Sequence, residues 1–359
     1  MKKFLKTFDF STFVPIILIS SLGLSVLYST NQEAFQWQVK FFAVGFLVYA
    51  ALALLNYSFW RKYWWLFYLA SLVLLGVVYF SGAATRGSVR WLSLGPLNLQ
   101  PSEFSKTALI LGLAALLQSS RTKYLTWQKV LWSAVLVLPV LGLVYLQPDL
   151  GTTIVLVAIW LGMLLFAGLR PRWLFLSLCL LGIFSYPLWG FLADYQKQRV
   201  VFFLNPRADP LGGGYHVLQS MIAVSSGQWL GRGFGRGTQS HLRFLPEHYT
   251  DFVFAAFCEE WGFVGGIVLI GLLFFLIWRI LEVAKRARSD FGTLVCIGVV
   301  SMLAVQVFVN IGMNMGMMPI TGITLPLVSY GGSSLWTTII ALGLVQSISS
   351  RARNASKTN

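Results

Sequence analysis

The sequence predicts an all-α protein of ten transmembrane helices, with one large and partly helical loop on the outer face of the membrane. Composition is the first reason: 57% of the 359 residues are hydrophobic and only 11% are charged, whereas soluble domains carry about 25% charged residues. The second reason is that apolar runs of about 18 residues, the length that crosses a bilayer, recur along the chain. We therefore interpret residues 1–359 as a single integral membrane domain.

The ten predicted spans are separated by short connections on one side and longer ones on the other. The first span follows a lysine-rich start and resembles a signal peptide, but the many further spans and the lack of a clear cleavage site favour an uncleaved helix. The fifth and sixth spans are separated only by residues 147–150, which predicts a tight helical hairpin. The predicted spans are residues 13–30, 39–56, 62–81, 104–119, 130–147, 151–168, 172–193, 252–280, 293–314 and 330–349.

Charges in the connections predict the orientation. Most lysines and arginines lie on the side that carries both termini, and this side is cytoplasmic under the positive-inside rule. The same rule accounts for the net charge of +15 without a nucleic-acid partner. Most acids and the long connections, residues 82–103, 194–251 and 313–330, lie on the other side. Because such long connections are usually functional, we expect the outer face to carry the site.

Asp251 is the strongest candidate for a catalytic residue. It lies where the loop of residues 194–251 enters the eighth span, followed by Glu259 and Glu260, and a charge at a membrane boundary is costly unless it has a partner or a function. A partly dehydrated carboxylate suits a general base. The structural alternative is an acid in the first turn of a helix. Glu247, four residues earlier, would share the face of Asp251 in a helix.

Several cations admit both a structural and a functional interpretation. Glu103 and Lys106 open the fourth span three residues apart, so they can pair on one helix face; alternatively, Lys106 and Arg90 bind phosphate while Glu103 orients Lys106. Arg199 and Arg207 in the large loop are snorkelling cations at the interface, or they form a cationic wall for a pyrophosphate, for which the arginine fork is suited.

The remaining candidates are uncharged or structural. Asp149, in the turn after the fifth span, is typical of a helix N-cap. The segment of residues 310–334 is dense in glycine, methionine and proline, which indicates irregular backbone that must be buried or line a cavity. We expect it to form the floor of the site that Asp251 faces, with Ser329 and Gly331 lining the cavity and Gln219 contributed by the large loop.

Taken in order, these motifs resemble the SEDS family (shape, elongation, division and sporulation), and within it the RodA branch. The resemblance runs from the first span to the tenth and rests on residues 100–106, 147–152, 245–252 and 319–334. The RodA leaning rests on residues 195–199, 214–220 and 237–247. Tyr249 stands where relatives usually have histidine, and Arg243 where many have an acid, so no family role is carried over to these two residues.

The resemblance implies a peptidoglycan glycosyltransferase of the bacterial cytoplasmic membrane, with both termini cytoplasmic and the active site extracytoplasmic. It implies polymerisation of lipid II for cell elongation and shape, with inversion at the donor sugar and departure of undecaprenyl pyrophosphate. Combined with the residues, it predicts that Asp251 takes the proton from the acceptor hydroxyl. The groups expected to stabilise the pyrophosphate or to orient its partners are Lys106, Arg90, Arg199, Arg207, Glu247 and Glu103.

The implied partners are lipid II, the growing glycan strand, membrane lipid and a class B penicillin-binding protein. The three histidines have no zinc-site spacing and the three cysteines stand singly, so no metal site or cofactor is predicted, although a divalent cation could accompany a pyrophosphate. Two alternatives stay open. Ten spans without a soluble domain suit a flippase for lipid-linked precursors equally well, and a non-catalytic scaffold could recruit the penicillin-binding protein.

Overall fold

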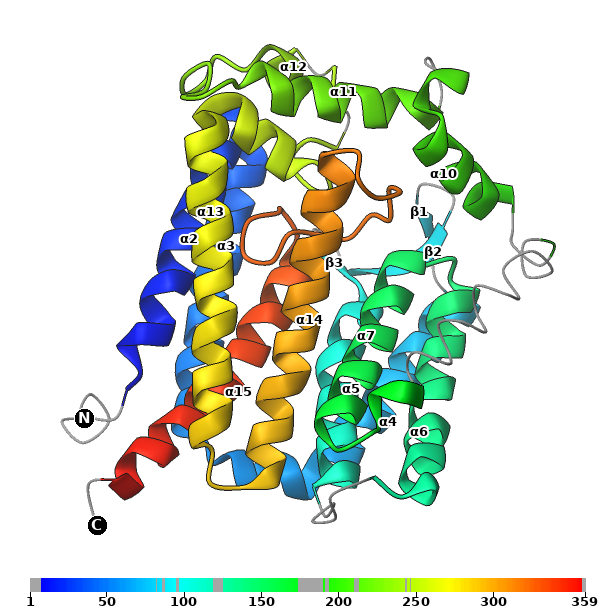
Figure 1. Cartoon of the computed structure of the whole chain (residues 1–359), viewed down its shortest axis with the longest axis vertical. Coiled ribbons are helices and arrows are strands. Elements are labelled where there is room, and N and C mark those ends of the chain that lie inside the picture. Colours follow the sequence, from blue (N-terminus) through cyan, green and yellow to red (C-terminus); the bar gives the residue numbers. More distant parts are fainter. Residues whose placement is uncertain are drawn as a thin grey trace.

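A computed structural model describes residues 8–81, 83–85, 88–94, 97–118, 125–173, 190, 194–209, 213–242, 244–245 and 247–356. It is a bundle of long helices with a layer of shorter helices across one end (Figure 1). In the described residues, six helices are long and apolar enough to cross a membrane, so the chain is a multi-pass membrane protein. They are α2 (Phe10–Thr30), α3 (Gln32–Leu54), α4 (Tyr57–Ser81), α6 (Trp127–Leu146), α13 (Val253–Arg286) and α14 (Asp290–Asn314).

Three further helices complete the bundle but are shorter or less apolar: α5 (Pro101–Leu117), α7 (Leu150–Phe166) and α15 (Gly332–Ser356). Helix α5 contacts α4, α6, α7, α14 and α15, and nearly all of its side chains are buried. A helix enclosed by other helices does not need an apolar surface toward lipid, which explains how α5 and the polar α15 fit inside a membrane protein. The count of ten spans is therefore not established, although every predicted span except residues 172–193 falls on one helix. Most of that span, residues 174–189 and 191–193, lies outside the described residues.

Several helices begin earlier than the apolar runs predict, because polar residues cap their first turns. Helix α3 begins at Gln32, where the Asn31 side chain accepts a hydrogen bond from the Ala34 amide at 3.0 Å. Ser289 caps α14 in the same way through the Gly292 amide at 3.2 Å. Such side chains satisfy amides that have no partner within the helix, so a helix extends beyond the apolar residues that reveal it.

The described residues are mostly helical, in agreement with the predicted all-α class, and contain one small sheet that the sequence did not predict. A three-stranded antiparallel sheet of order β1-β2-β3 precedes α5, with strands β1 (Ala83–Thr85), β2 (Ser88–Leu94) and β3 (Leu97–Leu99). Within it, Leu92 pairs with Leu99. Two of these strands are only three residues long, too short for a period-two pattern to identify them in a sequence.

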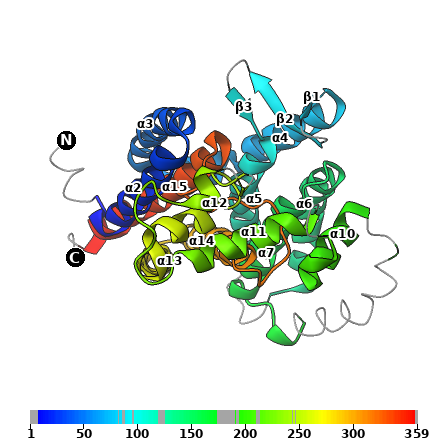
Figure 2. The ribbon, with the colours of Figure 1, turned by 90° about the horizontal axis from the view of Figure 1, so that it is seen from above.

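The predicted partly helical loop of residues 194–251 forms the layer across the bundle. It contains α10 (Asp194–Leu204), the 3₁₀ helix η1 (Pro206–Ala208), α11 (Gly213–Ser226) and α12 (Thr238–His241). Figure 1 and Figure 2 both place α10, α11 and α12 over one end of the helices. Figure 1 shows that α2 begins and α15 ends toward the opposite end. There Asp9 accepts a hydrogen bond from Ser349 at 2.8 Å and lies 3.5 Å from Arg279.

A break in α13 joins this layer to the bundle. Gly262 adopts φ 66° and ψ −167° inside the helix. The amides after the break donate instead to the layer, with Phe263 N bonded to Gln228 O at 2.8 Å. Glu259, one of the two acids that the sequence placed inside a span, accepts hydrogen bonds from the Gln239 and Ser240 amides at 2.8 and 3.1 Å. This buried acid therefore caps α12.

Candidate active site

A cavity that is partly open to solvent lies where the sheet, α10 and the ends of α5, α7, α14 and α15 meet. Two irregular segments, residues 247–251 and 321–331, complete its wall. Segments far apart in the sequence therefore meet at one site. The sequence-predicted residues that line the cavity are Arg90, Glu103, Lys106, Asp149, Arg199, Glu247, Asp251 and Gly331.

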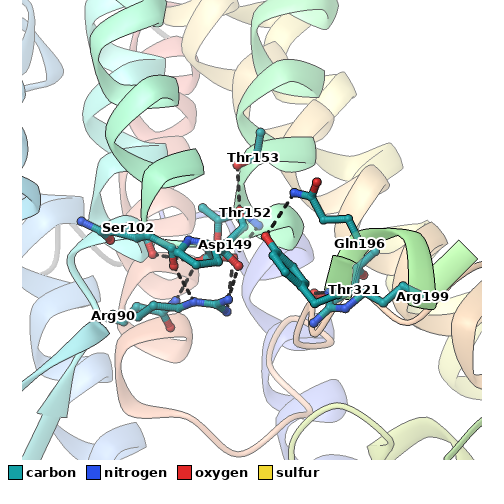
Figure 3. A network of polar contacts seen from close by, with 12 residues as sticks. Arg90, Ser102, Asp149, Thr152, Thr153, Gln196, Arg199 and Thr321 are labelled. Atoms are coloured by element: carbon teal, nitrogen blue, oxygen red, sulfur yellow. Dashed lines mark hydrogen bonds and ion pairs between the residues drawn. The ribbon is translucent and has the colours of Figure 1, made fainter. Parts of the chain in front are cut away.

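Asp149 holds the turn between α6 and α7 on one side of the cavity (Figure 3). One carboxylate oxygen accepts from the Thr152 amide at 3.1 Å, and the other accepts from Thr152 Oγ1, Gln100 Nε2 and Ser102 Oγ at 2.9 to 3.2 Å. The residue is therefore the N-cap that its position predicts, and it also lines the cavity.

Arg90, on β2, is bound to the same turn. Its Nε donates to Gln147 O at 2.8 Å, its Nη2 donates to Pro148 O, and its Nη1 lies 4.0 Å from Asp149. A guanidinium has five N–H donors, so these contacts fix Arg90 and leave further donors. The sheet that the sequence did not predict is thus what places this arginine at the cavity.

Lys106 and Glu103 form a buried ion pair on α5. Lys106 Nζ lies 2.7 Å from Glu103 Oε2, and the two side chains are 2% and 9% exposed. The short distance agrees with the structural pairing of the two residues. Their place in the wall of the cavity agrees with the functional interpretation. An ammonium carries three donors, and Glu103 holds Lys106 by one of them.

Arg199 reaches the cavity from α10. Its Nη1 donates to Thr321 O at 3.3 Å (Figure 3). Its guanidinium lies 5.8 Å from the Tyr195 ring. Burial lowers the pKa of Arg199, and the charge of Arg90 lowers it further, while Tyr195, Asp251 and Asp149 act in the opposite direction. Two arginines therefore face one cavity closely enough to repel each other.

Asp251 belongs to a turn and not to the first turn of a helix. Residues 247–250 form turns, Glu247 has φ 51°, and α13 begins only at Val253. The Thr250 and Phe252 amides both donate to Glu247 O, at 3.1 and 3.3 Å. The segment from Glu247 to Asp251 is therefore not the helix in which the two residues would share a face, yet both residues line the cavity.

The glycine- and proline-rich segment between α14 and α15 is irregular, as predicted. Part of it, within residues 321–331, forms a wall of the cavity. Gln38 of α3 satisfies its backbone by donating to Ser329 O at 3.1 Å and accepting from Gly331 N at 3.2 Å. Ser329 itself donates to Thr250 O at 2.7 Å. Ser329 thus fixes the turn before Asp251 without lining the cavity.

Two other predicted residues lie away from the cavity. Arg207 is exposed on η1, and Gln219 lies on α11; neither lines the wall. Tyr249, which departs from the family pattern, lies with its ring 5.8 Å from that of Tyr330. Arg243 lies outside the described residues.

Sequence reasoning missed uncharged polar residues that line the cavity, notably Thr152, Gln306 and Thr321. Gln306 is 1% exposed, and no described residue donates to its Oε1. A buried glutamine in an apolar run is the signal that could have found it. Four acids line the wall, but in the described part of the chain no three His, Cys, Asp or Glu side chains come together as a metal site.

Comparisons with known proteins agree with this architecture. Residues 2–354 match the family of FtsW, RodA and SpoVE, described as a cell cycle protein. The peptidoglycan glycosyltransferase MrdB of Escherichia coli K12 is 41% identical over 320 residues, covering 88% of this chain and 85% of that protein. The peptidoglycan glycosyltransferase RodA of Treponema pallidum is 32% identical, covering 96% of this chain and 98% of that protein.

Solved structures are similar over nearly the whole chain. One, described as showing structural coordination of polymerization and crosslinking by a peptidoglycan synthase complex, has a TM-score of 0.84 and 33% identity, covering 96% of this chain and 98% of that one. The rod shape determining protein RodA of Thermus thermophilus has a TM-score of 0.73 and 31% identity, covering 95% and 96%.

Proposed function

The chain belongs to the SEDS family of cell cycle proteins, which includes FtsW, RodA and SpoVE, and from that premise we propose how its cavity works as a polymerase of lipid II. The chain is a peptidoglycan glycosyltransferase of the elongation and cell-shape type, as are the relatives that it matches over most of its length. One observation carries the proposal for the site: Asp251 lines the same cavity as Arg90, Lys106 and Arg199.

In the proposed reaction, Asp251 accepts the proton of the acceptor sugar hydroxyl while that oxygen attacks the anomeric carbon of the donor. The bond from this carbon to the pyrophosphate oxygen breaks, the configuration inverts, and undecaprenyl pyrophosphate leaves. Negative charge grows on the pyrophosphate, so fixed cations that face it stabilise the transition state more than the ground state. Lys106, Arg90 and Arg199 are these cations, and Glu103 orients Lys106.

The location and the partner of the site follow from the same premise. We place the cavity on the extracytoplasmic side, because α10, α11 and α12 cover that end of the bundle, whereas the ends of α13 and α15, which carry Lys285, Arg286 and Arg351, lie at the other (Figure 1). One of the matching structures is described as a peptidoglycan synthase complex that coordinates polymerization and crosslinking. This description supports a class B penicillin-binding protein as partner. The proposed mechanism uses no cofactor. If a divalent cation takes part, it would enter with the pyrophosphate. Measuring polymerisation in the presence of EDTA tests whether such a cation is needed.

The test is polymerisation of labelled lipid II by purified protein, with and without a class B penicillin-binding protein. Asp251→Asn removes the base but keeps the size of the side chain, so we expect a loss of activity of about 10²-fold or more, the range of general base catalysis. Glycan chains are resolved on a gel, and only variants with wild-type thermal stability are compared.

Each other outcome points elsewhere. Polymer from Asp251→Asn at the wild-type rate would move the base to another residue. No polymer from wild-type protein, even with the partner, would favour the flippase or scaffold alternatives, which lipid transport in vesicles and partner binding would then separate.

A further inference from the structure

Two buried asparagines on α14 hold the turn that carries Asp251. Asn310 and Asn314 are both fully buried and lie four residues apart, on one face of the helix. The Asn310 Nδ2 donates to Asp251 O at 3.0 Å, and the Asn314 Nδ2 donates to the same oxygen at 3.1 Å. One backbone carbonyl thus receives two side-chain amides.

Each amide also binds a second segment. The Asn310 Nδ2 donates to Ile323 O at 2.7 Å, in the irregular wall of the cavity. The Asn314 Oδ1 accepts from the Ala255 amide at 3.1 Å, in the first turn of α13. Because the nitrogens face carbonyls and this oxygen faces an N–H group, the network itself fixes the orientation of both amides. The pair therefore joins α14, α13, the catalytic turn and the cavity wall.

The Asp251 carboxylate faces the segment that Asn310 holds. A Cβ atom placed on Gly322, the residue before Ile323, would lie 3.6 Å from Asp251 Oδ2. One amide therefore sets both the backbone of Asp251 and the position of the wall beside its carboxylate. Without Asn310, Ser329 would still join the wall to the turn at Thr250, but the direct link between the Asp251 carbonyl and Ile323 would be lost.

We propose that Asn310 and Asn314 are positioning residues for the glycosyl transfer: they fix Asp251 in register with the cavity wall so that its carboxylate meets the acceptor hydroxyl. This inference rests on the proposed function of Asp251. General base catalysis needs the base within hydrogen-bond reach of the proton, and a misplacement of about 1 Å can cost about 10²-fold in rate. Neither asparagine lines the cavity, so their effect on substrate binding is small.

The experiment compares Asn310→Leu and Asn314→Leu with wild type in lipid II polymerisation, with the partner present. We expect kcat to fall by about 10- to 100-fold while KM changes by less than about 2-fold, since only an interaction of the transition state is lost. Gln346→Leu is the matched control: Gln346 is a buried amide on α15 that accepts from Tyr49 Oη at 3.2 Å. It should lower thermal stability without lowering kcat.

A double-mutant cycle separates positioning from a general effect on folding. If Asn310 acts through Asp251, Asn310→Leu should cost no further activity in protein that already carries Asp251→Asn. Losses that multiply, or single variants with wild-type kcat, would overturn the inference while leaving Asp251 as the base. Conversely, an active Asp251→Asn protein would remove the proposed function first.

Less disruptive variants keep the test open if a leucine variant does not fold. Asn310→Ser and Asn314→Ser retain a hydroxyl donor in place of the amide, so each should lose less kcat than the leucine variant and keep a normal KM. A serine variant that folds and polymerises at the wild-type rate would contradict the inference.

Discussion

The buried pair of Lys106 and Glu103 allows stability and catalysis to be separated. Its two side chains are 2% and 9% exposed and 2.7 Å apart, so solvent screens the pair little. Removing one partner from a buried pair leaves an uncompensated charge and costs about 3–5 kcal/mol, whereas replacing both partners with well-packed apolar residues of similar volume is often close to neutral. We expect Lys106→Met and Glu103→Gln each to lose about 3 kcal/mol, the lower end of that range, since the cavity admits some water.

The double variant Lys106→Met/Glu103→Gln leaves no unpaired charge, so it should recover part of this stability, less the cost of burying an amide without that partner. On the scale of soluble domains of a few hundred residues, about 3 kcal/mol corresponds to about 6 °C or more in Tm, which thermal unfolding in detergent resolves. Activity should behave differently: neither the single variants nor the double variant should polymerise lipid II normally, because the ammonium that faces the leaving pyrophosphate is gone or is no longer oriented.

Two results would refute this reasoning. A double variant as unstable as Lys106→Met would show that the charge left on Glu103 is not the cause of the loss. A stable double variant with wild-type polymerisation would show that Lys106 is a structural cation only, and the pyrophosphate would then depend on Arg90 and Arg199.

Two further predictions concern the layer of residues 194–251. Burial lowers the pKa of His216, against the smaller opposing effect of Glu247. In acid, the unfolded chain, in which this histidine has an ordinary pKa of about 6.5, therefore binds more protons than the folded chain. The stability that the neutral histidine gives the folded chain is present above that pH and is lost as pH falls below it. His216→Phe should therefore flatten the fall in Tm between about pH 7 and 5, and an unchanged slope would contradict this. At the break in α13, a Cβ on Gly262 would collide with Gly231 N, and its backbone region is nearly exclusive to glycine, so Gly262→Ala should destabilise by about 1–3 kcal/mol. Gly271→Ala is the control, since a Cβ there meets no atom within 4 Å in the described structure; equal Tm values for both variants would refute the prediction.

Much of this architecture could be predicted because charge is scarce in the chain. Apolar runs indicated where helices lie, and capping residues explain why the helices begin a few residues earlier. Against this background, Asp251, Glu103 and Lys106 stood out as charges next to apolar segments, where charges are costly. All three line the cavity.

Uncharged and irregular features could not be predicted in the same way. Asn310 and Asn314 carry no charge, and a single sequence does not say which carbonyls their amides meet. Arg199 and Arg207 belong to the same loop and the same residue type, yet α10 ends at Leu204 and only Arg199 faces the cavity. What distinguishes them is the direction of the chain after α10, which depends on tertiary contacts and not on local sequence.

The pairing of charges in the cavity bears on how it would receive a diphosphate. Burial lowers the pKa of Arg199, and the charge of Arg90 lowers it further; the two like charges repel each other, and without nearby acids they would tend to separate. Asp149 lies 4.0 Å from Arg90, and Glu103 holds Lys106, so the cations are kept in place without a ligand. The Asp149 carboxylate is hydrogen-bonded by Thr152, Gln100 and Ser102 and not by Arg90, whose Nη1 is 4.0 Å away, so donors of the cations remain for phosphate oxygens. A site preorganised in this way reorganises little when charge develops on the leaving group, which is the condition under which fixed cations accelerate a transfer most.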